Sequence, residues 1–335
     1  MKMPLISVII PVYNGEEFIP VCIESLLNMD YPSDKFEIII IVDNNSTDGT
    51  ADVVRRYPVR YLFESIKGPS AARNTGARVA RGNILAFTDV DVIVEKNWLF
   101  EIEKNFTNQD IDAVMGVCKG INRNIWAELG QRYYEIFVAQ RKSEGKNLRK
   151  IDTKNFAIRK AVFLESGGFD NNFMNSEDLE FGLRLYDRGY KTVFSSGVKI
   201  NHINASELGT IINARREQSF YDYKIAQRYD EESNKEYFPS LSRWRYRCIF
   251  LKNRKVEKPI LVILNYMLPI FIRLSVLLLK VPFFFGVRKK LYPVFSLTLG
   301  LATIHGKILS RSVERGYLSM NAHCEAKIFK RQKIF

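Results

Sequence analysis

The chain has 335 residues, of which 46% are hydrophobic and 26% charged, and its formal net charge is +13. At roughly 150 residues per domain this length suggests one large domain or two moderate ones, and the composition excludes disordered and low-complexity classes. The four cysteines, at 22, 118, 248 and 324, lack the spacing of a zinc site or a disulfide framework, which indicates a reducing compartment.

The excess positive charge is confined to the last third of the chain. Residues 1–210 hold 26 Lys and Arg against 28 Asp and Glu, a net charge of −2, whereas residues 211–335 hold 24 against 9, a net charge of +15. The basic part is also the most apolar part. This combination favours binding to anionic lipid headgroups and argues against a nucleic-acid partner.

The first 200 residues alternate predicted strands with predicted helices. Residues 5–11 and 36–42 are continuous apolar runs that suit strands buried on both faces. Between them we expect Asn14 to cap a helix whose first turn holds Glu16 and Glu17. Further strands are expected at 59–63, 84–87, 154–159 and 193–200, and further helices at 47–57, 70–80 and 177–188. This alternation predicts an α/β fold, a doubly wound, mostly parallel sheet with flanking helices, followed by a helical, apolar and basic C-terminal region.

Polar side chains follow three of the predicted strands, at 11–14, 43–50 and 89–91. In such sheets ligands bind outside the carboxyl ends of the strands. Asp89 and Asp91 are two apart on an extended chain, so their carboxylates share a face and suit Mg²⁺ or Mn²⁺, which would neutralise a leaving diphosphate. Residues 67–76 add small side chains, which allow a close approach of the backbone, and Arg73, whose guanidinium can donate two hydrogen bonds to a phosphate. Each motif alone is also compatible with a turn or a helix cap, but together they favour a nucleotide-diphosphate site.

Six blocks in this order resemble the family 2 glycosyltransferases, which have the GT-A fold. The blocks are 11–14, 42–50, 68–76, 89–91, 167–170 and 177–180, and the resemblance covers residues 4–205. It implies an inverting, metal-dependent transfer of a hexosyl or N-acetylhexosaminyl group from a nucleotide-diphospho-sugar, usually a UDP-sugar, to an acceptor hydroxyl.

The resemblance implies a nucleotide site built from five residues. Pro11 and Tyr13 match the positions that hold the base, with Tyr13 stacking on it, and Asp43 matches the acceptor of the uracil ring NH. Arg73 matches an arginine near the base and the diphosphate. Asp89 matches the carboxylate on the ribose and metal side.

The resemblance also implies the metal ligands and the catalytic group. Asp91 matches the direct ligand of Mn²⁺ or Mg²⁺, with Asp89 beside it, and His202 follows a strand where some relatives use a histidine on the diphosphate or the metal. Asp178, with Glu177 before it, matches the general base that takes the proton of the acceptor hydroxyl. Glu177 and Asp178 can also be explained without catalysis, because acidic side chains in the first turn of a helix interact favourably with the helix dipole.

The chain departs from the family pattern at two places. The chain has Asp43-Asn44 where many members have two aspartates, which leaves open the role of the second carboxylate. The Gln-x-x-Arg-Trp block typical of processive polysaccharide synthases is missing, and 215–218 only lies near its place. Single-sugar transfer is therefore favoured. Residues 154–159 return as a strand, so Thr153 or Asn155 is expected at the sugar.

The last third is expected to attach the enzyme to a membrane. We predict a catalytic domain at 1–210, an amphipathic basic helical segment at 211–258, membrane-associated apolar helices at 259–310 and a basic tail at 311–335. Residues 260–279 are long enough to span about 30 Å of bilayer, but polar residues and a proline interrupt them. Helices at 259–304 that span the membrane and helices that lie in its interface both remain open, as does a dimer interface with a basic rim.

The amino terminus lacks the features of a signal peptide, so the expected location is the cytoplasmic face of the membrane. The expected acceptor is a glycan or a lipid-linked precursor in lipid-linked, cell-wall or exopolysaccharide synthesis. Two alternatives remain: a noncatalytic membrane scaffold that retains the nucleotide-binding fold, and a sugar nucleotidyltransferase, whose Gly-rich signature after the first strand is missing.

Overall fold

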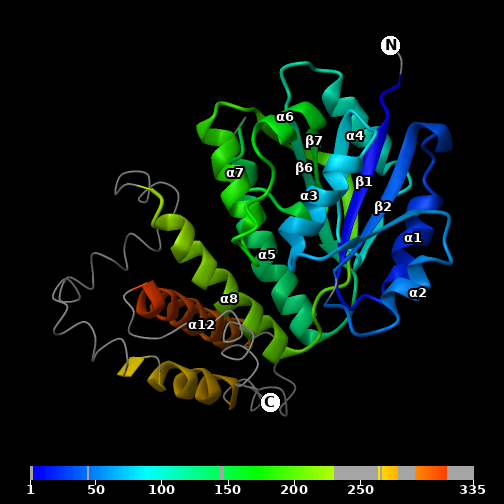
Figure 1. Cartoon of the computed structure of the whole chain (residues 1–335). Coiled ribbons are helices and arrows are strands. Elements are labelled where there is room, and N and C mark those ends of the chain that lie inside the picture. Colours follow the sequence, from blue (N-terminus) through cyan, green and yellow to red (C-terminus); the bar gives the residue numbers. More distant parts are fainter. Residues whose placement is uncertain are drawn as a thin grey trace. The chain divides into compact units, whose positions relative to one another are not determined.

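A computed structural model describes residues 3–43, 45–143, 147–229, 263–264, 266–277 and 291–314. The chain divides into two compact units, Met1–Asn204 and Ala205–Phe335 (Figure 1). Each unit is described by itself. The predicted segments or parts of segments at 230–262, 278–290 and 315–335 lie outside the described residues.

In its described part, the first unit is built on one eight-stranded sheet with the order β3-β2-β1-β4-β7-β6-β8-β5 (Figure 1). β1, β2, β3 and β4 are parallel neighbours, β7 runs antiparallel to β4 and β6, and β5 runs antiparallel to β8. The strands are β1 (Ile6–Val12), β2 (Phe36–Asp43), β3 (Arg60–Glu64), β4 (Ile84–Phe87), β5 (Val92–Val94), β6 (Ala113–Gly120), β7 (Phe156–Arg159) and β8 (Thr192–His202).

Helices cover both faces of this sheet, as predicted, and bury two hydrophobic clusters against it. On β1, Val8 and Ile10 join one cluster with side chains of α1 and α4, while Ile9 joins the other with side chains of α3, α6 and α7. Two-sided burial explains why these strands are apolar throughout. The helices of this unit are α1 (Ile19–Leu27), α2 (Thr50–Val54), α3 (Pro69–Val79), α4 (Trp98–Phe106), α5 (Ile125–Ser143), α6 (Lys160–Glu165) and α7 (Glu177–Asp187).

A bulge between Met115 and Val117 divides β6 into two parts. The first part pairs with β7 and β8, and the second part pairs with β8 in parallel. Gly116 lies at the bulge, and a Cβ there would lie 2.2 Å from the backbone oxygen of Val198. Only glycine leaves room for this close approach of β8.

The prediction that Asn14 caps the first helix is wrong. α1 begins at Ile19, and Asn14 has a positive φ of 48°. Its side-chain oxygen accepts a hydrogen bond of 2.7 Å from the backbone of Thr47, and its own N–H donates to Ser46 Oγ. Asn14 therefore joins the ends of β1 and β2 through their loops, which is a role that asparagine can fill because it tolerates this backbone conformation.

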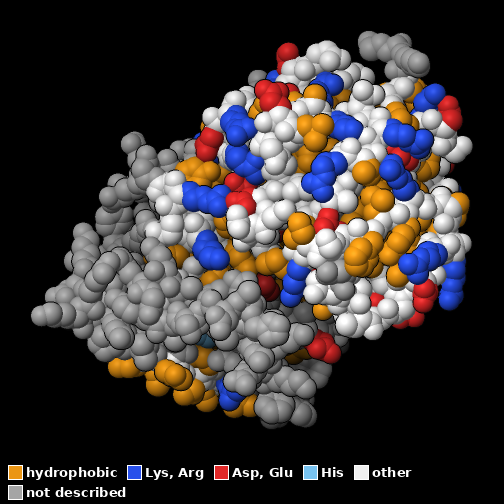
Figure 2. All heavy atoms as spheres, in the orientation of Figure 1, with side chains coloured by type: hydrophobic (Ala, Val, Ile, Leu, Met, Phe, Trp, Pro, Cys, Tyr) orange, Lys and Arg blue, Asp and Glu red, His pale blue; other side chains and the backbone are white. Residues whose placement is uncertain are grey.

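The second unit contains α8 (Leu208–Ala226), α12 (Leu291–Glu314) and a helical segment at 266–277. Arg215 Nε donates to Thr303 Oγ1 at 2.9 Å, and Thr298 Oγ1 donates to Ser275 Oγ at 3.0 Å, so α12 contacts both other helices. The outer face of 266–277 exposes large apolar side chains (Figure 2), namely Tyr266, Met267, Ile270, Phe271, Leu274 and Leu277. Among the described residues, no helix has the length and apolarity that crossing a membrane requires.

Candidate active site

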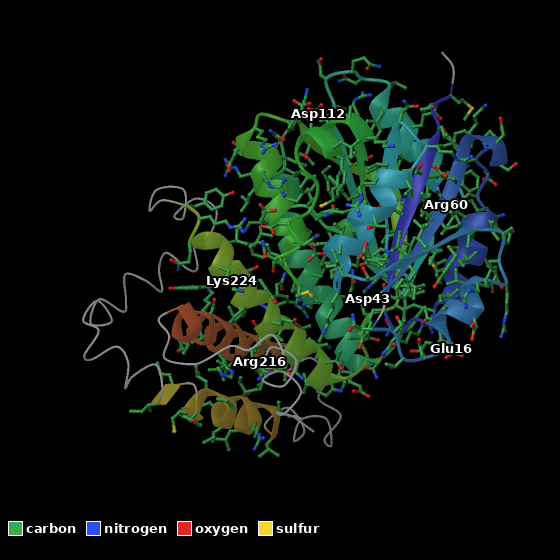
Figure 3. All side chains as sticks on the ribbon, viewed as in Figure 1. Glu16, Asp43, Arg60, Asp112, Arg216 and Lys224 are labelled. Atoms are coloured by element: carbon green, nitrogen blue, oxygen red, sulfur yellow. The ribbon has the colours of Figure 1, made fainter. Side chains whose placement is uncertain are left out.

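The predicted site residues of the strand ends lie at one edge of the sheet. Asp43 is the last residue of β2, and Asp89 follows β4, which runs parallel to it through β1. Figure 3 shows Asp43 at this edge and Asp112, which precedes β6, at the opposite one. Because the carboxyl ends of parallel strands meet at one edge, side chains far apart in sequence are brought together here.

Asp43 fixes the start of α3. Its Oδ2 accepts a 2.9 Å hydrogen bond from the backbone N–H of Gly68, and its Oδ1 accepts one of 2.8 Å from Asn45. Gly68 has a φ of 113°, a conformation that favours glycine, and it directly precedes the first turn of α3. At the end of the neighbouring strand, Tyr13 is 52% exposed and offers its ring as a stacking surface, while Pro11 lies opposite Ile41 of β2.

Arg73 of α3 joins two acidic segments at the centre of the site. Its guanidinium is 2.6 Å from the carboxylate of Glu177 and 2.8 Å from that of Asp89, and the side chain is almost fully buried. Burial alone would lower the pKa of Arg73, but the charges of Asp89 and Glu177 outweigh it and raise the pKa. A buried guanidinium with two carboxylate partners is a rigid connection between α3, the end of β4 and the start of α7.

The two acids at the start of α7 have different surroundings. Ser176 precedes them with a φ of 60°, a left-handed conformation that turns the chain into the helix. Glu177 is buried and bonded to Arg73, whereas Asp178 is half-buried and its Oδ1 accepts from the N–H of Leu179 at 2.7 Å. Asp178 is therefore the more accessible of the two carboxylates.

Asp91 and His202 form a second pair, at the start of β5 and the end of β8. His202 Nε2 lies 3.2 Å from Asp91 Oδ2, and His202 Nδ1 lies 2.6 Å from Asn204 Oδ1. Since an amide oxygen only accepts, Nδ1 carries the proton and donates to Asn204. Burial alone would lower the pKa of His202, but the hydrogen bond to Asp91 and its charge raise it.

This pair fits a divalent metal. Asp91 Oδ1 is buried and has no hydrogen-bond partner among the described residues, which leaves a carboxylate oxygen available as a ligand. A carboxylate oxygen suits both Mn²⁺ and Mg²⁺, and an imidazole nitrogen beside it favours the transition metal Mn²⁺. Within the part of the chain that the structure describes, no three His, Cys, Asp or Glu gather into a metal cluster. Two protein donors are the number expected where substrate phosphates complete the coordination.

An ion pair that the sequence analysis did not predict, between Asp152 and Lys154, lies near Asp89. Asp152 Oδ1 is 2.9 Å from Lys154 Nζ, and its Oδ2 accepts from Tyr134 at 2.9 Å. The backbone oxygen of Lys154 accepts from Thr88, the residue before Asp89. Burial alone would lower the pKa of Lys154, but Asp152 and the other acidic groups around it hold the pKa well above its usual value. A cation therefore lies close to the strand end that carries Asp89.

The expectation that Asn155 meets the sugar is wrong. Asn155 is 1% exposed, its amide nitrogen donates to the backbone oxygens of Val117 and Val198, and its oxygen accepts from the indole of Trp98 at 2.9 Å. The amide is used entirely to join β6, β7, β8 and α4.

Two family models match the chain. "Glycosyl transferase family 2" matches residues 7–167, and "Glycosyl transferase family group 2" matches residues 89–305, more than half of the chain. Among curated proteins, the chain is 31% identical to "Glycosyltransferase AglE" of Haloferax volcanii over 58% of this chain and 66% of that protein. It is 28% identical to a dolichyl N-acetyl-alpha-D-glucosaminyl phosphate diacetamido-dideoxy-glucuronosyltransferase of Methanococcus voltae, over 63% of this chain and 70% of the other. The chain spans only 49% of a third relative, the "Probable glycosyltransferase YdaM" of Bacillus subtilis.

Solved structures share the fold. A mannosyltransferase from Pyrobaculum calidifontis, in complex with GDP-Man and Mn²⁺, has a TM-score of 0.61 at 18% identity and covers 91% of this chain and 88% of its own. Staphylococcus aureus TarS in complex with UDP has a TM-score of 0.51 at 18% identity and covers 93% and 92%. At this identity the likeness concerns the fold, which is the GT-A arrangement predicted from the sequence. Because the family models match the chain, one of them over more than half of its length, the chain belongs to the family 2 glycosyltransferases.

Proposed function

We propose that the protein transfers one sugar from a nucleotide-diphospho-sugar, with UDP as the expected carrier, to a hydroxyl of a glycan or lipid-linked acceptor with inversion. The observation that carries this proposal is the Arg73 bridge. It joins the strand end of Asp89 to the helix start of Glu177 and Asp178 through contacts of 2.8 and 2.6 Å. A diphosphate site and a proton acceptor are thereby held together. TarS bound to UDP supports a UDP-sugar, whereas the mannosyltransferase shows that a similar fold also takes GDP-Man.

Asp178 is the proposed general base. It takes the proton of the acceptor hydroxyl while the acceptor oxygen forms its bond to the anomeric carbon, and the bond from that carbon to the diphosphate oxygen breaks. Glu177, which was expected to share the catalytic role, is bonded to Arg73 and acts as a positioning residue. Asp43 and Tyr13 are proposed to hold the base.

Asp91 and His202 are the residues that would hold Mn²⁺ or Mg²⁺, with Asp89 beside them. When bound, such an ion neutralises charge on the departing nucleoside diphosphate. Asn204 keeps Nδ1 of His202 protonated, so Nε2 faces Asp91 and the metal position. Lys154 adds a fixed positive charge near Asp89.

A screen of nucleotide sugars tests the proposal, with release of free nucleoside diphosphate measured in Mn²⁺ and again in excess chelator. We expect release with at least one donor, its loss in chelator, and a decrease in transfer of about 10²- to 10⁴-fold in Asp178→Asn. Asp110→Asn, in an exposed loop, is the matched control and should keep full activity. Full activity of Asp178→Asn would contradict the assignment of the base. Release of pyrophosphate would favour the nucleotidyltransferase alternative, and no turnover of any donor would favour the scaffold.

We also propose that the enzyme works at the cytoplasmic face of an anionic membrane. The exposed apolar face of the helical segment 266–277 and the net charge of +15 over residues 211–335 support this location. Vesicles with 30% phosphatidylglycerol should sediment the full chain, and vesicles of phosphatidylcholine alone should sediment much less. The double change Phe271→Ser and Leu274→Ser should release it, while Phe100→Ser, an exposed position of the first unit, should not. Equal recovery from both kinds of vesicle, or from neither, would contradict the proposal.

A further inference from the structure

A pocket of about 330 Å³ opens in the first unit where the chain leaves β6 and β8. Its volume lies at the lower end of the range of small-molecule sites, about 300–1,000 Å³. The walls come from the end of β6, the loops after β6 and β8, and the first half of α5. The lining residues are Gly120, Asn122, Ala127, Glu128, Gln131, Arg132, Glu135 and Asn204.

Hydrogen bonds between its walls fix the shape of this pocket. Asn122 and Asn204 exchange two bonds, of 2.7 and 3.0 Å, so the loop after β6 is tied to the loop after β8. Gln131 of α5 accepts from the Asn204 amide at 3.2 Å and donates to Glu135 at 3.2 Å. A Cβ on Gly120 would lie 2.1 Å from Asn204 Nδ2, so this position must lack a side chain for the walls to meet.

The same residues connect the pocket to the proposed transfer site. Gly120 lies opposite His202 in the register of β6 and β8. Asn204 donates to Gln131 in the pocket wall and accepts from His202, which faces Asp91. The pocket therefore shares a wall with the residues proposed to face the donor diphosphate, on the half of the sheet away from Asp43 and Tyr13.

The lining is suited to a sugar. Glu128 and Glu135 are exposed carboxylates one α5 turn to either side of Gln131, where each can accept hydrogen bonds from sugar hydroxyls. The lining holds two acidic side chains and one basic side chain, Arg132, so an anionic ligand would meet net negative charge. A neutral pyranose matches both the volume and the polar groups.

We infer that this pocket binds the acceptor sugar, as a neutral pyranose whose hydroxyls are held by Glu128 and Glu135. The inference rests on the proposed glycosyl transfer and names the chemical class of its acceptor.

The test uses the full chain and separates acceptor binding from donor turnover. Glu128→Trp fills the pocket from an exposed helical position, and Glu24→Trp, on the exposed side of α1, is the matched control. Binding of neutral methyl glycosides and of methyl glucuronide is followed by saturation-transfer NMR. In parallel, nucleoside diphosphate release is measured with and without the same glycosides.

We expect at least one neutral glycoside to bind and to accelerate nucleotide release in the unmodified chain and in Glu24→Trp. Glu128→Trp should weaken that binding at least tenfold, whereas Glu24→Trp should leave both the binding and the glycoside-independent donor hydrolysis within twofold of the unmodified chain. Preference for the glucuronide, undiminished binding in Glu128→Trp, or no binding of any neutral glycoside overturns the inference. If the chain turns over no donor but binds a glycoside in a way that depends on Glu128, the result would support the sugar-binding pocket and contradict the proposed glycosyl transfer.

Discussion

Replacing Arg73 with methionine should destabilise the first unit, because it leaves the carboxylate of Glu177 buried without its partner. The side chain of Glu177 is 9% exposed and that of Asp89 is 27% exposed, so the loss comes mainly from Glu177. Breaking a buried ion pair costs about 3–5 kcal/mol, and the contact with the more exposed Asp89 adds little beyond that. With a denaturant slope of about 3 kcal/mol per molar urea, the midpoint should fall by about 1–1.7 M.

The fluorescence of Trp98, which is fully buried in the first unit, reports this transition in a chain with Trp126 and Trp244 replaced by phenylalanine. Adding Glu177→Gln to Arg73→Met removes the stranded charge and should recover at least half of the lost stability. Arg78→Met, on the exposed side of the same helix, should change the unfolding free energy by about 0.5 kcal/mol or less. An unchanged midpoint in Arg73→Met, or a double variant no more stable than the single one, would refute the reasoning.

Three further changes test the surroundings of the site. Trp98→Phe leaves the amide oxygen of Asn155 buried without its donor, which should lower the unfolding free energy by about 1–3 kcal/mol. An unchanged transition in calorimetry would contradict this expectation. Gly116→Ala places a Cβ 2.2 Å from a backbone oxygen of β8 and should cost about 1–3 kcal/mol by urea unfolding, with an unaffected midpoint as the contrary result. Asn204→Ala removes the acceptor of His202 Nδ1 and should weaken Mn²⁺ binding about 10- to 100-fold in a titration, which equal affinity would contradict.

The strand ends show what could be predicted from the sequence. Continuous apolar runs placed β1, β2 and β4 within a residue of their observed bounds, because burial on both faces leaves no other pattern. Asp43 ends β2 and Asp89 follows β4, so the parallel strands bring both residues to one edge of the sheet, as predicted. The contacts of Arg73 with Asp89 and Glu177 involve two helices, α3 and α7, and were not predicted.

Contacts that depend on particular loops could not be predicted. Asn14 carries a good capping side chain, but its partner is Thr47, 33 residues away, and not the next helix. A run of four residues does not reveal that β7 is antiparallel to β4, so the burial of Asn155 in the core could not be predicted. The ion pair of Asp152 and Lys154 was overlooked because two charges two apart resemble an exposed loop until Tyr134 covers them.

The bulge in β6 separates a part of the strand that holds the sheet together from a part that leads into the pocket. Before Gly116 the strand is locked between β7 and β8, whereas beyond it the strand pairs with β8 and ends in the loop that lines the pocket. Exchanges in the loop downstream of the bulge can therefore alter the inferred acceptor pocket without shifting the register of β6 with β7, provided that Gly120, Asn122 and Asn204 keep the wall that the pocket shares with His202.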